Sequence, residues 1–230
     1  MSPARLIVRS AAYHWRTNLA VCLGVATAVA VLGGALVVGD SVRSSLRDLA
    51  TSRLGRTGYA ITSMGFFRET LAADISDSAS ASAPLVAVSA LVTHEPSGRR
   101  AANVLVYGVD NRFWKFHGLE PREGVYVSPA LATELQVQAG DVLLARLQKP
   151  SAIPLESLFA RKDDVSRTLR LAATATLPRR ELGEFSLQPQ QGEVRAIFAP
   201  LRRIQRDLAV AGEVNTVLMD VADDQKAERA

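Results

Sequence analysis

Histidine, serine and carboxylate side chains are the groups in this sequence that could carry out catalysis or bind a metal ion. The three histidines, His14, His94 and His117, lie far apart, and none has a partner at the spacing that metal sites use. Spacing alone leaves a Ser-His-Asp set open, but the sequence contains no GxSxG nucleophile elbow. We therefore expect His94, beside a predicted hairpin turn, and His117, beside an aromatic cluster, to be solvated or packed side chains.

Phosphate-binding and acid–base motifs are also missing from the sequence. There is no GxxxxGK[ST] loop, so we do not expect the chain itself to hydrolyse ATP by that machinery. The paired carboxylates Asp163-Asp164 and Asp223-Asp224 are adjacent along the chain and are expected on solvated loops, whereas a raised carboxylate pKa requires burial. We predict no catalytic residue, no cofactor, no metal ion and no enzymatic activity.

Charge and composition argue against a nucleic-acid partner. The formal net charge is +4, but the basic residues are scattered and aromatic residues make up only 6% of the chain, so no basic stripe with interleaved aromatics is present. Cys22 is the single cysteine, which leaves residues 41–230 without any. That segment neither needs a reducing compartment nor offers a disulfide.

The residues discussed so far mostly follow one long apolar run. This run is LAVCLGVATAVAVLGGALVVG, at residues 19–39, and its role decides where the rest of the chain lies. It could be a cleaved export signal, a buried core helix or a membrane span. As a helix it reaches about 31 Å, close to the roughly 30 Å hydrocarbon core of a bilayer and longer than the apolar part of most signal peptides. Cys22 opens the run instead of closing it, which argues against a lipoprotein signal. We predict a transmembrane helix at 19–39.

The residues on either side of the predicted span suggest how it meets the membrane. Residues 1–18 have an amphipathic helical pattern and are expected to lie on the membrane surface, with Tyr13, Trp15 and Arg16 as interfacial anchors. An ordinary first turn of the span is the alternative. Arginines flank the run on both sides, so the positive-inside count does not discriminate. Long domains can cross a membrane largely regardless of their charge, and the chain contains no cysteine after Cys22. Both observations favour a location outside the cytoplasm for the bulk of the chain.

Small residues recur every four positions along the predicted span and provide a surface on which another helix could pack closely. One row is Ala20, Gly24 and Ala28, and the other is Ala26, Ala30 and Gly34. We interpret them as contacts with further membrane helices. The alternative is that an alanine-rich composition produces this spacing by chance.

A second helical pattern, at residues 40–56, directly follows the predicted span. Val42, Leu46 and Leu49 follow helical spacing, with arginines on the other faces. Asp40 or Ser41 could cap a separate helix, or the segment could continue the membrane helix outward as a stalk.

The remainder of the chain alternates short strands with short helices. Alternation and turn residues predict strands at 59–62, 85–92, 101–109, 125–127, 142–147, 167–177 and 213–221, and a polar loop followed by a strand at 185–200. Helical spacing and caps predict helices at 66–75, 128–135 and 200–212, the last ending at Gly212, and a helical turn or loop that begins at a capping Asp110 over 110–118. Loops are expected at 76–84 and at 149–164, the second with a short helix. The predicted hairpins and the mixed order of strands and helices along the chain predict an α+β domain.

Two details of these elements are specific enough to check. In the 167–177 strand, Leu169, Leu171, Ala173, Ala175 and Leu177 are predicted to share one face. In the 200–212 helix, Leu201, Ile204 and Leu208 are predicted to face inward and Arg202, Arg203 and Arg206 outward.

The order of these segments resembles the N-terminal half of an FtsX-like ABC transporter permease with a MacB-like periplasmic core domain. The stretches that carry the resemblance are residues 6–55, GVDNRFWKF (108–116), YVSPALATELQVQAGDVLLARL (126–147), IFAPLRRIQRDL (197–208) and VNTVLM (214–219). None of them is a catalytic signature. The resemblance places the periplasmic core domain at 57–222 and implies a cytoplasmic ATPase subunit, a second permease subunit or half, and an optional periplasmic partner.

The resemblance implies a bacterial inner-membrane protein whose ATPase drives movements that the outer domain turns into mechanical work. Three further spans would follow that domain, but no second apolar run occurs here, and residues 223–230 have the pattern of a helix leading back to the membrane. We interpret the chain as a fragment or as a shortened protein. The alternative function is a self-sufficient, single-span anchored domain that serves as a binding or scaffold module. The sequence does not indicate a substrate.

Overall fold

The computed structural model describes residues 7, 9, 10, 12–76, 81–148, 166–188, 190 and 192–220. The chain divides into two compact units, residues 1–49 and residues 50–230, which are treated separately below. The second is called the folded unit. The loop predicted at 149–164 and the helix start predicted at 223–230 lie outside the described residues.

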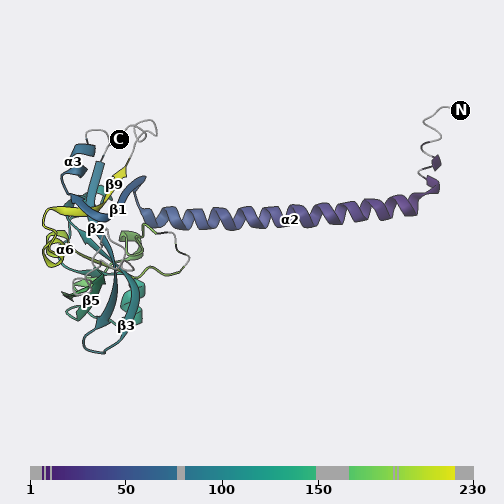
Figure 1. Cartoon of the computed structure of the whole chain (residues 1–230). Coiled ribbons are helices and arrows are strands. Elements are labelled where there is room, and N and C mark those ends of the chain that lie inside the picture. Colours follow the sequence, from purple (N-terminus) through teal and green to yellow (C-terminus); the bar gives the residue numbers. More distant parts are fainter. Residues whose placement is uncertain are drawn as a thin grey trace, which may run out of the picture. The chain divides into compact units, whose positions relative to one another are not determined.

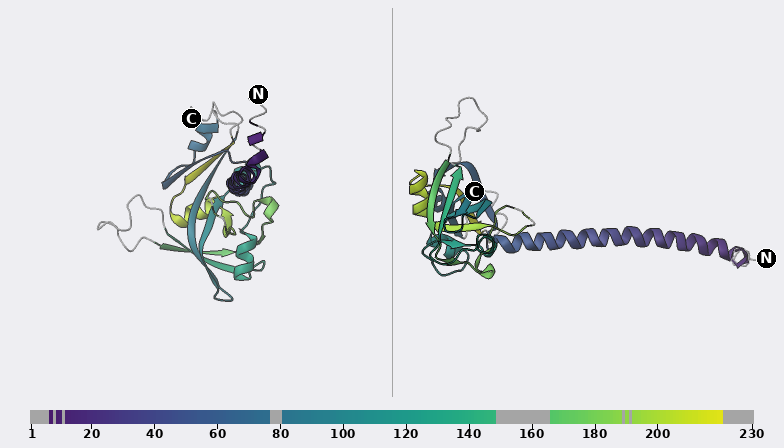
Figure 2. Two further views of the ribbon diagram at one scale, coloured as in Figure 1. Left: turned by 90° about the vertical axis from the view of Figure 1, so that its right-hand side faces the viewer. Right: turned by 90° about the horizontal axis from the view of Figure 1, so that it is seen from below.

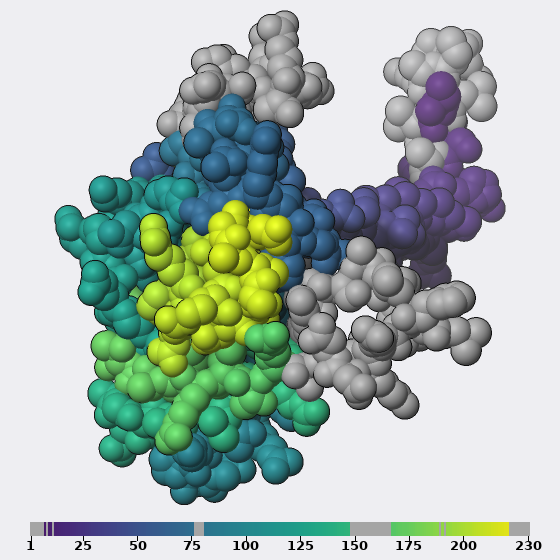
Figure 3. Space-filling view, turned by 60° about the vertical axis from the view of Figure 1, so that its left-hand side comes forward, coloured from purple at the N-terminus to yellow at the C-terminus, as the bar shows by residue number. Residues whose placement is uncertain are grey.

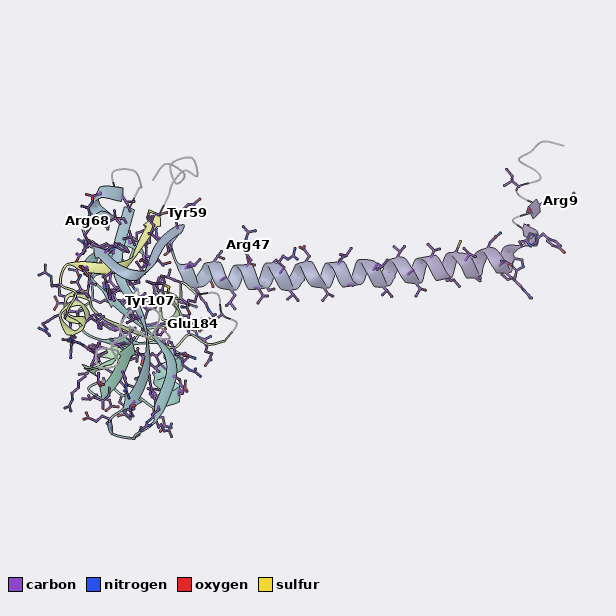
Figure 4. All side chains as sticks on the ribbon, viewed as in Figure 1. Arg9, Arg47, Tyr59, Arg68, Tyr107 and Glu184 are labelled. Carbon is purple, nitrogen blue, oxygen red and sulfur yellow. The ribbon has the colours of Figure 1, made fainter. Side chains whose placement is uncertain are left out.

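One long helix, α2 (Trp15–Leu54), contains both the predicted span and most of the predicted stalk. It runs for 40 residues without a break, so neither Asp40 nor Ser41 begins a new helix (Figure 2, right). Its apolar side chains project outward on all sides (Figure 4), and Leu32 and Leu36 are 67% and 75% exposed. Among the described residues, α2 is the only helix long and apolar enough to cross a membrane, and none of its apolar window is buried. It is therefore not a core helix of this fold.

The folded unit is built on one nine-stranded mixed sheet. Its strands are β1 (Tyr59–Arg68), β2 (Ala81–His94), β3 (Arg100–Val109), β4 (Tyr126–Val127), β5 (Val142–Gln148), β6 (Ser166–Ala172), β7 (Ala175–Thr176), β8 (Ala196–Pro200) and β9 (Glu213–Asp220). The main path is β1-β9-β2-β3-β8-β4-β7, and β5 and β6 branch from β2. The predicted α+β class is confirmed.

The strand β2 joins the two parts of the sheet. Its first residues pair antiparallel with β9, from Ala81↔Asp220 to Leu85↔Thr216, and its later residues pair with β3 and β5 (Figure 1). The predicted hairpin of 85–92 with 101–109 is confirmed. The prediction of a loop through Pro84 was wrong, because Ala83 and Pro84 are buried and their pairing with β9 outweighs the small, polar character of this stretch.

The strand β1 also extends further than its sequence indicated. We predicted a strand at 59–62 and a helix at 66–75, but β1 continues to Arg68 and the helix α3 covers only Leu71–Ser76. The register with β9 shifts between Thr62 and Phe67, and Phe66 and Phe67 pack against the core. Aromatic residues suit a half-buried sheet surface, and this tertiary packing overrides the helical spacing.

Short helices flank the sheet, and most of their ends match the predicted caps. In α4 (Asn111–Phe116) the Asp110 side chain accepts from Arg112 N, and in α5 (Pro129–Leu135) the Ser128 hydroxyl accepts from Leu131 N. The 3₁₀ turn η2 covers Arg179–Glu181.

The helix α6 (Leu201–Leu208) buries the three side chains predicted to face inward, Leu201, Ile204 and Leu208. Its end was predicted wrongly. Ala209 adopts the left-handed conformation at φ 57°, so the helix stops there and not at Gly212. Gly212, also at positive φ, immediately precedes β9.

The predicted 167–177 strand is split into β6 and β7. The chain changes partner at Thr174, whose backbone N–H donates to Val125 O while its hydroxyl accepts from Val125 N at 3.0 Å. Leu169, Leu171, Ala173 and Leu177 are buried as predicted, but Ala175 is exposed. The break in the ladder shifts the alternation of side chains, which is why Ala175 leaves the buried face.

Two apolar clusters fill the folded unit. The larger one is aliphatic and includes side chains from β2, β5, β6 and α6. The other is aromatic and contains Tyr107, Phe113, Trp114, Phe185 and Phe198, with the Tyr107 and Phe198 rings stacked and their centroids 5.4 Å apart. The segments that carry these side chains are therefore fixed relative to one another.

Candidate functional site

The predicted helix-packing residues all lie on α2 and all are exposed. Ala20, Gly24, Ala28, Ala30 and Gly34 cover no other described element. A Cβ atom added at Gly24 or Gly34 would meet nothing within 4 Å, so the helix surface is open there. Leu23, Ala26, Thr27, Ala30 and Val31 line a shallow groove on this helix. Contact with a second helix stays a prediction.

The predicted interfacial anchors lie at the start of α2. Tyr13 and Trp15 are 83% and 56% exposed, and the Arg16 guanidinium stands 5.7 Å from the centroid of the Trp15 ring. Of the predicted stalk residues, Val42 and Leu46 are exposed and Leu49 is half-buried. Their anchoring and stalk roles stay predictions.

The last turn of α2 is fastened inside the folded unit by a buried arginine. Arg53 is only 8% exposed. Its Nη1 donates to Gln190 O at 2.6 Å and its Nη2 donates to Gly192 O at 2.9 Å. Sequence reasoning missed this contact, because Arg53 was counted only as a charge that follows the span. The signal available was the polar QPQQGE stretch, which supplies the carbonyl groups.

A hollow of about 410 Å³ lies next to this arginine, between the end of α2 and His117. Arg56 N donates to His117 Nδ1 at 3.2 Å, and the Arg56 side chain forms an ion pair with Asp220 at 2.8 Å. Gly55 has φ +60°, and a Cβ atom there would lie 2.7 Å from His117 Nδ1. Burial, and then the charge of Arg56, lower the pKa of His117 to about 4, so the ring is neutral at physiological pH.

A hollow of about 1070 Å³ in the folded unit forms a cleft beside α6. Arg112 lies in it and donates from Nε to Asp110 Oδ2 at 2.8 Å and from Nη2 to Glu69. Gln205, which is 5% exposed, donates to Glu69 Oε2 at 2.8 Å and to Glu213 O at 2.9 Å. Glu69, Arg112 and Asp110 are therefore held in one connected network in the wall of this cleft.

The electrostatics of the cleft favour a charged Glu69. Burial raises the pKa of Glu69, but the hydrogen bonds from Gln205 and Arg112 outweigh burial and lower it overall. Arg122, Arg202 and Arg206 add positive charge to the lining. The cleft can bind a ligand by charge and hydrogen bonding. Sequence reasoning missed it because its residues come from β1, β3, the following loops and α6.

The structure does bring a serine, a histidine and an aspartate together. His94 Nδ1 lies 2.7 Å from Ser97 Oγ and His94 Nε2 lies 3.1 Å from Asp141 Oδ2. His94 is 4% exposed, and Asp141 Oδ2 also accepts from Gln138 N at 2.7 Å. In serine hydrolases the serine usually meets Nε2 and the carboxylate Nδ1, the reverse of this arrangement. The three residues tie the β2–β3 turn to the start of β5, and we assign them that structural role.

Metal ligands do not cluster in the part of the chain that the structure describes. No group of three or more histidine, cysteine or carboxylate side chains is placed there so as to hold an ion.

Comparisons with known proteins were made at three levels. No protein-family profile and no curated protein sequence matches the chain. Among solved structures, the periplasmic region of MacB from Actinobacillus actinomycetemcomitans is 10% identical, with a TM-score of 0.45 over 80% of this chain and 85% of that one.

The extracellular domain of the noncanonic ABC-type transporter YknZ from Gram-positive bacteria is 8% identical, with a TM-score of 0.44 over 71% of this chain and 78% of that one. Both neighbours are extracytoplasmic domains of ABC-type transporters. The proposals below rest on the residues of this chain.

Proposed function

We propose that this chain is the first span and the extracytoplasmic domain of a permease subunit of an ABC-type transporter, of the FtsX, macrolide-exporter or lipoprotein-release class. The observation that carries the proposal is α2 (Trp15–Leu54), a single helix whose exposed apolar residues suit lipid and whose last turn belongs to the folded unit. The segment order from residue 6 to residue 219 resembles the same class. The proposed location of the chain is the bacterial inner membrane.

The length of α2 supports a span that continues outward as a stalk. A helix of 40 residues is about 60 Å long, whereas the hydrocarbon core needs only about 30 Å. The helix contains no glycine or proline between Asp40 and Leu54 that would interrupt it. Because rigid secondary structure carries displacement better than a flexible linker, such a helix suits a relay from the membrane to Arg53.

In the proposed cycle, different subunits carry out different steps. A separate cytoplasmic ATPase hydrolyses ATP, and a second permease subunit or half packs against the small residues of α2, including Gly24 and Ala28. Movement of the spans is passed along α2 and changes the position of the folded unit. Mechanical action in the envelope follows, without catalysis by the chain itself.

A second candidate function is a self-sufficient anchored domain that binds a ligand or partner outside the cytoplasm. The observation that favours it is the cleft of about 1070 Å³, whose wall contains the Glu69–Arg112–Asp110 network. In this case no ATPase partner is needed.

Topology and partner experiments separate the two functions. Alkaline phosphatase fused after Ala230 should be active, and green fluorescent protein at the same position should stay dark, because the folded unit is expected outside the cytoplasm. Purification of the tagged chain from crosslinked native membranes should recover an ATPase with a phosphate-binding loop. An active phosphatase without any ATPase would favour the anchored binding domain. A fluorescent fusion would contradict both functions.

A further inference from the structure

A second, smaller hollow on the folded unit is lined mainly by arginines. It lies between β6 and α6 and has a volume of about 560 Å³. The C-terminal residues after position 200, yellow-green to yellow, adjoin the green residues that include β6 on this face (Figure 3). The lining residues are Arg167, Thr168, Leu169, Arg170, Arg203, Arg206 and Asp207.

Backbone carbonyl groups hold two of these arginines in place without neutralising them. Arg167 Nη1 donates to Asp207 O at 3.0 Å, and Arg203 Nη2 donates to Arg170 O. Each bond runs between β6 and α6, so the two elements orient each other's guanidinium groups. A carbonyl oxygen carries only a partial charge, and both arginines therefore keep their full positive charge.

Carboxylates do not balance this group of arginines. Asp207 lies 3.8 Å from Arg203 and 3.5 Å from Arg206, and Glu95 forms an ion pair with Arg170 at 2.8 Å. Among the described residues, four guanidinium groups thus face two carboxylates, which leaves a surplus of two positive charges around this hollow. Like charges held this close repel one another, and an anion that binds there relieves the repulsion.

We propose that this hollow binds a phosphate group. Guanidinium groups match phosphate oxygens in geometry and can donate two hydrogen bonds to them, and the negative charge of a phosphate group offsets the positive surplus. The exposed Thr168 hydroxyl in the wall supplies a further donor. The phosphate can belong to a free phosphorylated solute or to a phospholipid headgroup.

The site is distinct from the features on which the proposed function depends. It lies between β6 and α6, whereas the transporter proposal rests on α2. It shares only Arg206 with the larger cleft, whose acidic residues Glu69 and Asp110 are not among its lining residues. A test of phosphate binding is therefore independent of whether the chain works with an ATPase.

Binding is tested on the full chain in a neutral detergent by titration calorimetry with two probes, inorganic pyrophosphate and glycerophosphoglycerol. Pyrophosphate represents a free phosphorylated solute, and glycerophosphoglycerol represents a phospholipid headgroup. We expect one of the probes to bind with an affinity that falls as salt rises. The tighter probe identifies the source of the phosphate. If neither binds at low salt, the proposal is wrong.

Substitutions locate the binding. Thr168→Glu places a carboxylate in the hollow without removing any arginine and should weaken binding at least tenfold, whereas the neutral control Thr168→Gln should bind within about twofold of the unchanged chain. Arg167→Gln combined with Arg203→Gln should abolish measurable binding.

The exposed Arg100 of β3 is not a lining residue, so Arg100→Gln serves as the control for a general loss of charge. Circular dichroism confirms that each variant is folded. Equal affinity in Thr168→Glu and Thr168→Gln would overturn the proposal even if the arginine variants fail to fold.

Discussion

Arg53 Nη2 donates a hydrogen bond of 2.9 Å to Gly192 O, which joins the last turn of α2 to a loop 139 residues further along the chain. A second hydrogen bond runs from Nη1 to Gln190 O, so the guanidinium group makes two hydrogen bonds to this loop. The arginine is buried and its charge is met by carbonyl oxygens. This contact is where movement of α2 would reach the folded unit, so it is the natural place to test the relay.

Replacing this arginine should loosen the loop that it holds. Arg53→Met keeps much of the side-chain volume but removes both donors, and we expect it to destabilise the folded unit by about 2–3 kcal/mol, because two charge-assisted hydrogen bonds from a buried guanidinium group are lost. For a unit of this size that corresponds to a fall in Tm of about 5–10 °C. Hydrogen exchange of residues 186–195 should speed up as well.

Arg43→Met serves as the control, because Arg43 is an exposed residue of the same helix. Its Tm should stay within about 2 °C of the unchanged chain. If Arg53→Met behaves like this control, Arg53 does not fasten α2 in the way that its contacts indicate.

The buried ring of His117 should make stability depend on pH. Its pKa is about 4 in the folded state and about 6.5 in the unfolded chain. Above pH 6.5 the ring is neutral in both states. Between pH 6.5 and 4 the unfolded chain takes up a proton that the folded chain does not, so the free energy of unfolding falls as the pH falls, by about 3 kcal/mol at most. Below pH 4 this contribution is constant.

His117→Asn isolates this contribution from that of other acids. Asparagine can accept the hydrogen bond from Arg56 N but does not titrate. The difference in unfolding free energy between the variant and the unchanged chain should be flat above pH 6.5 and should shift in favour of the variant between pH 6.5 and 4. Chemical denaturation at a series of pH values measures it. A difference that is independent of pH would rule out a buried, neutral His117.

Asn215 should stabilise the point at which β2 changes its partner. Its Oδ1 accepts from Ala87 N and its Nδ2 donates to Ala87 O, both at 2.8 Å. The side chain thus makes the two hydrogen bonds that the backbone of a neighbouring strand would otherwise make. Asn215 is 5% exposed. Asn215→Ala leaves both backbone groups of Ala87 without these partners, and we expect a loss of about 2–4 kcal/mol in chemical denaturation.

The exposed Asn111 provides the comparison for this substitution. Asn111→Ala removes an amide of the same size at the start of α4 and should change stability by less than about 0.5 kcal/mol. Equal effects of the two substitutions would mean that the bonds to Ala87 are worth no more than a surface amide.

The small residues of α2 should matter for assembly and not for insertion. Gly24→Leu fills the open surface of the helix and should prevent close approach of a neighbouring helix, while the segment remains apolar enough to insert. Crosslinking in membranes should show loss of the complex with unchanged membrane fractionation. Val21→Leu, at an exposed and already large position, is the control. Unchanged crosslinking in Gly24→Leu would remove this surface from the proposed assembly.

Local patterns along the sequence determined the elements whose signals are themselves local. The apolar run at 19–39 predicted a long helix, Asp110 and Ser128 predicted the starts of α4 and α5, and the spacing of Leu201, Ile204 and Leu208 predicted the buried face of α6. These features depend on helix periodicity and on caps, which involve residues only a few positions apart.

Only the tertiary structure decided features that need partners from distant parts of the chain. Residues 81–84 became strand because β9 lies beside them, and Phe66 and Phe67 extended β1 because a core was there to cover them. The contact of Arg53 with Gly192, the cleft around Glu69 and the arginine-lined hollow each combine segments that are far apart in sequence. Hydrogen bonding and burial at such places depend on three-dimensional neighbours, which periodicity along one chain does not encode.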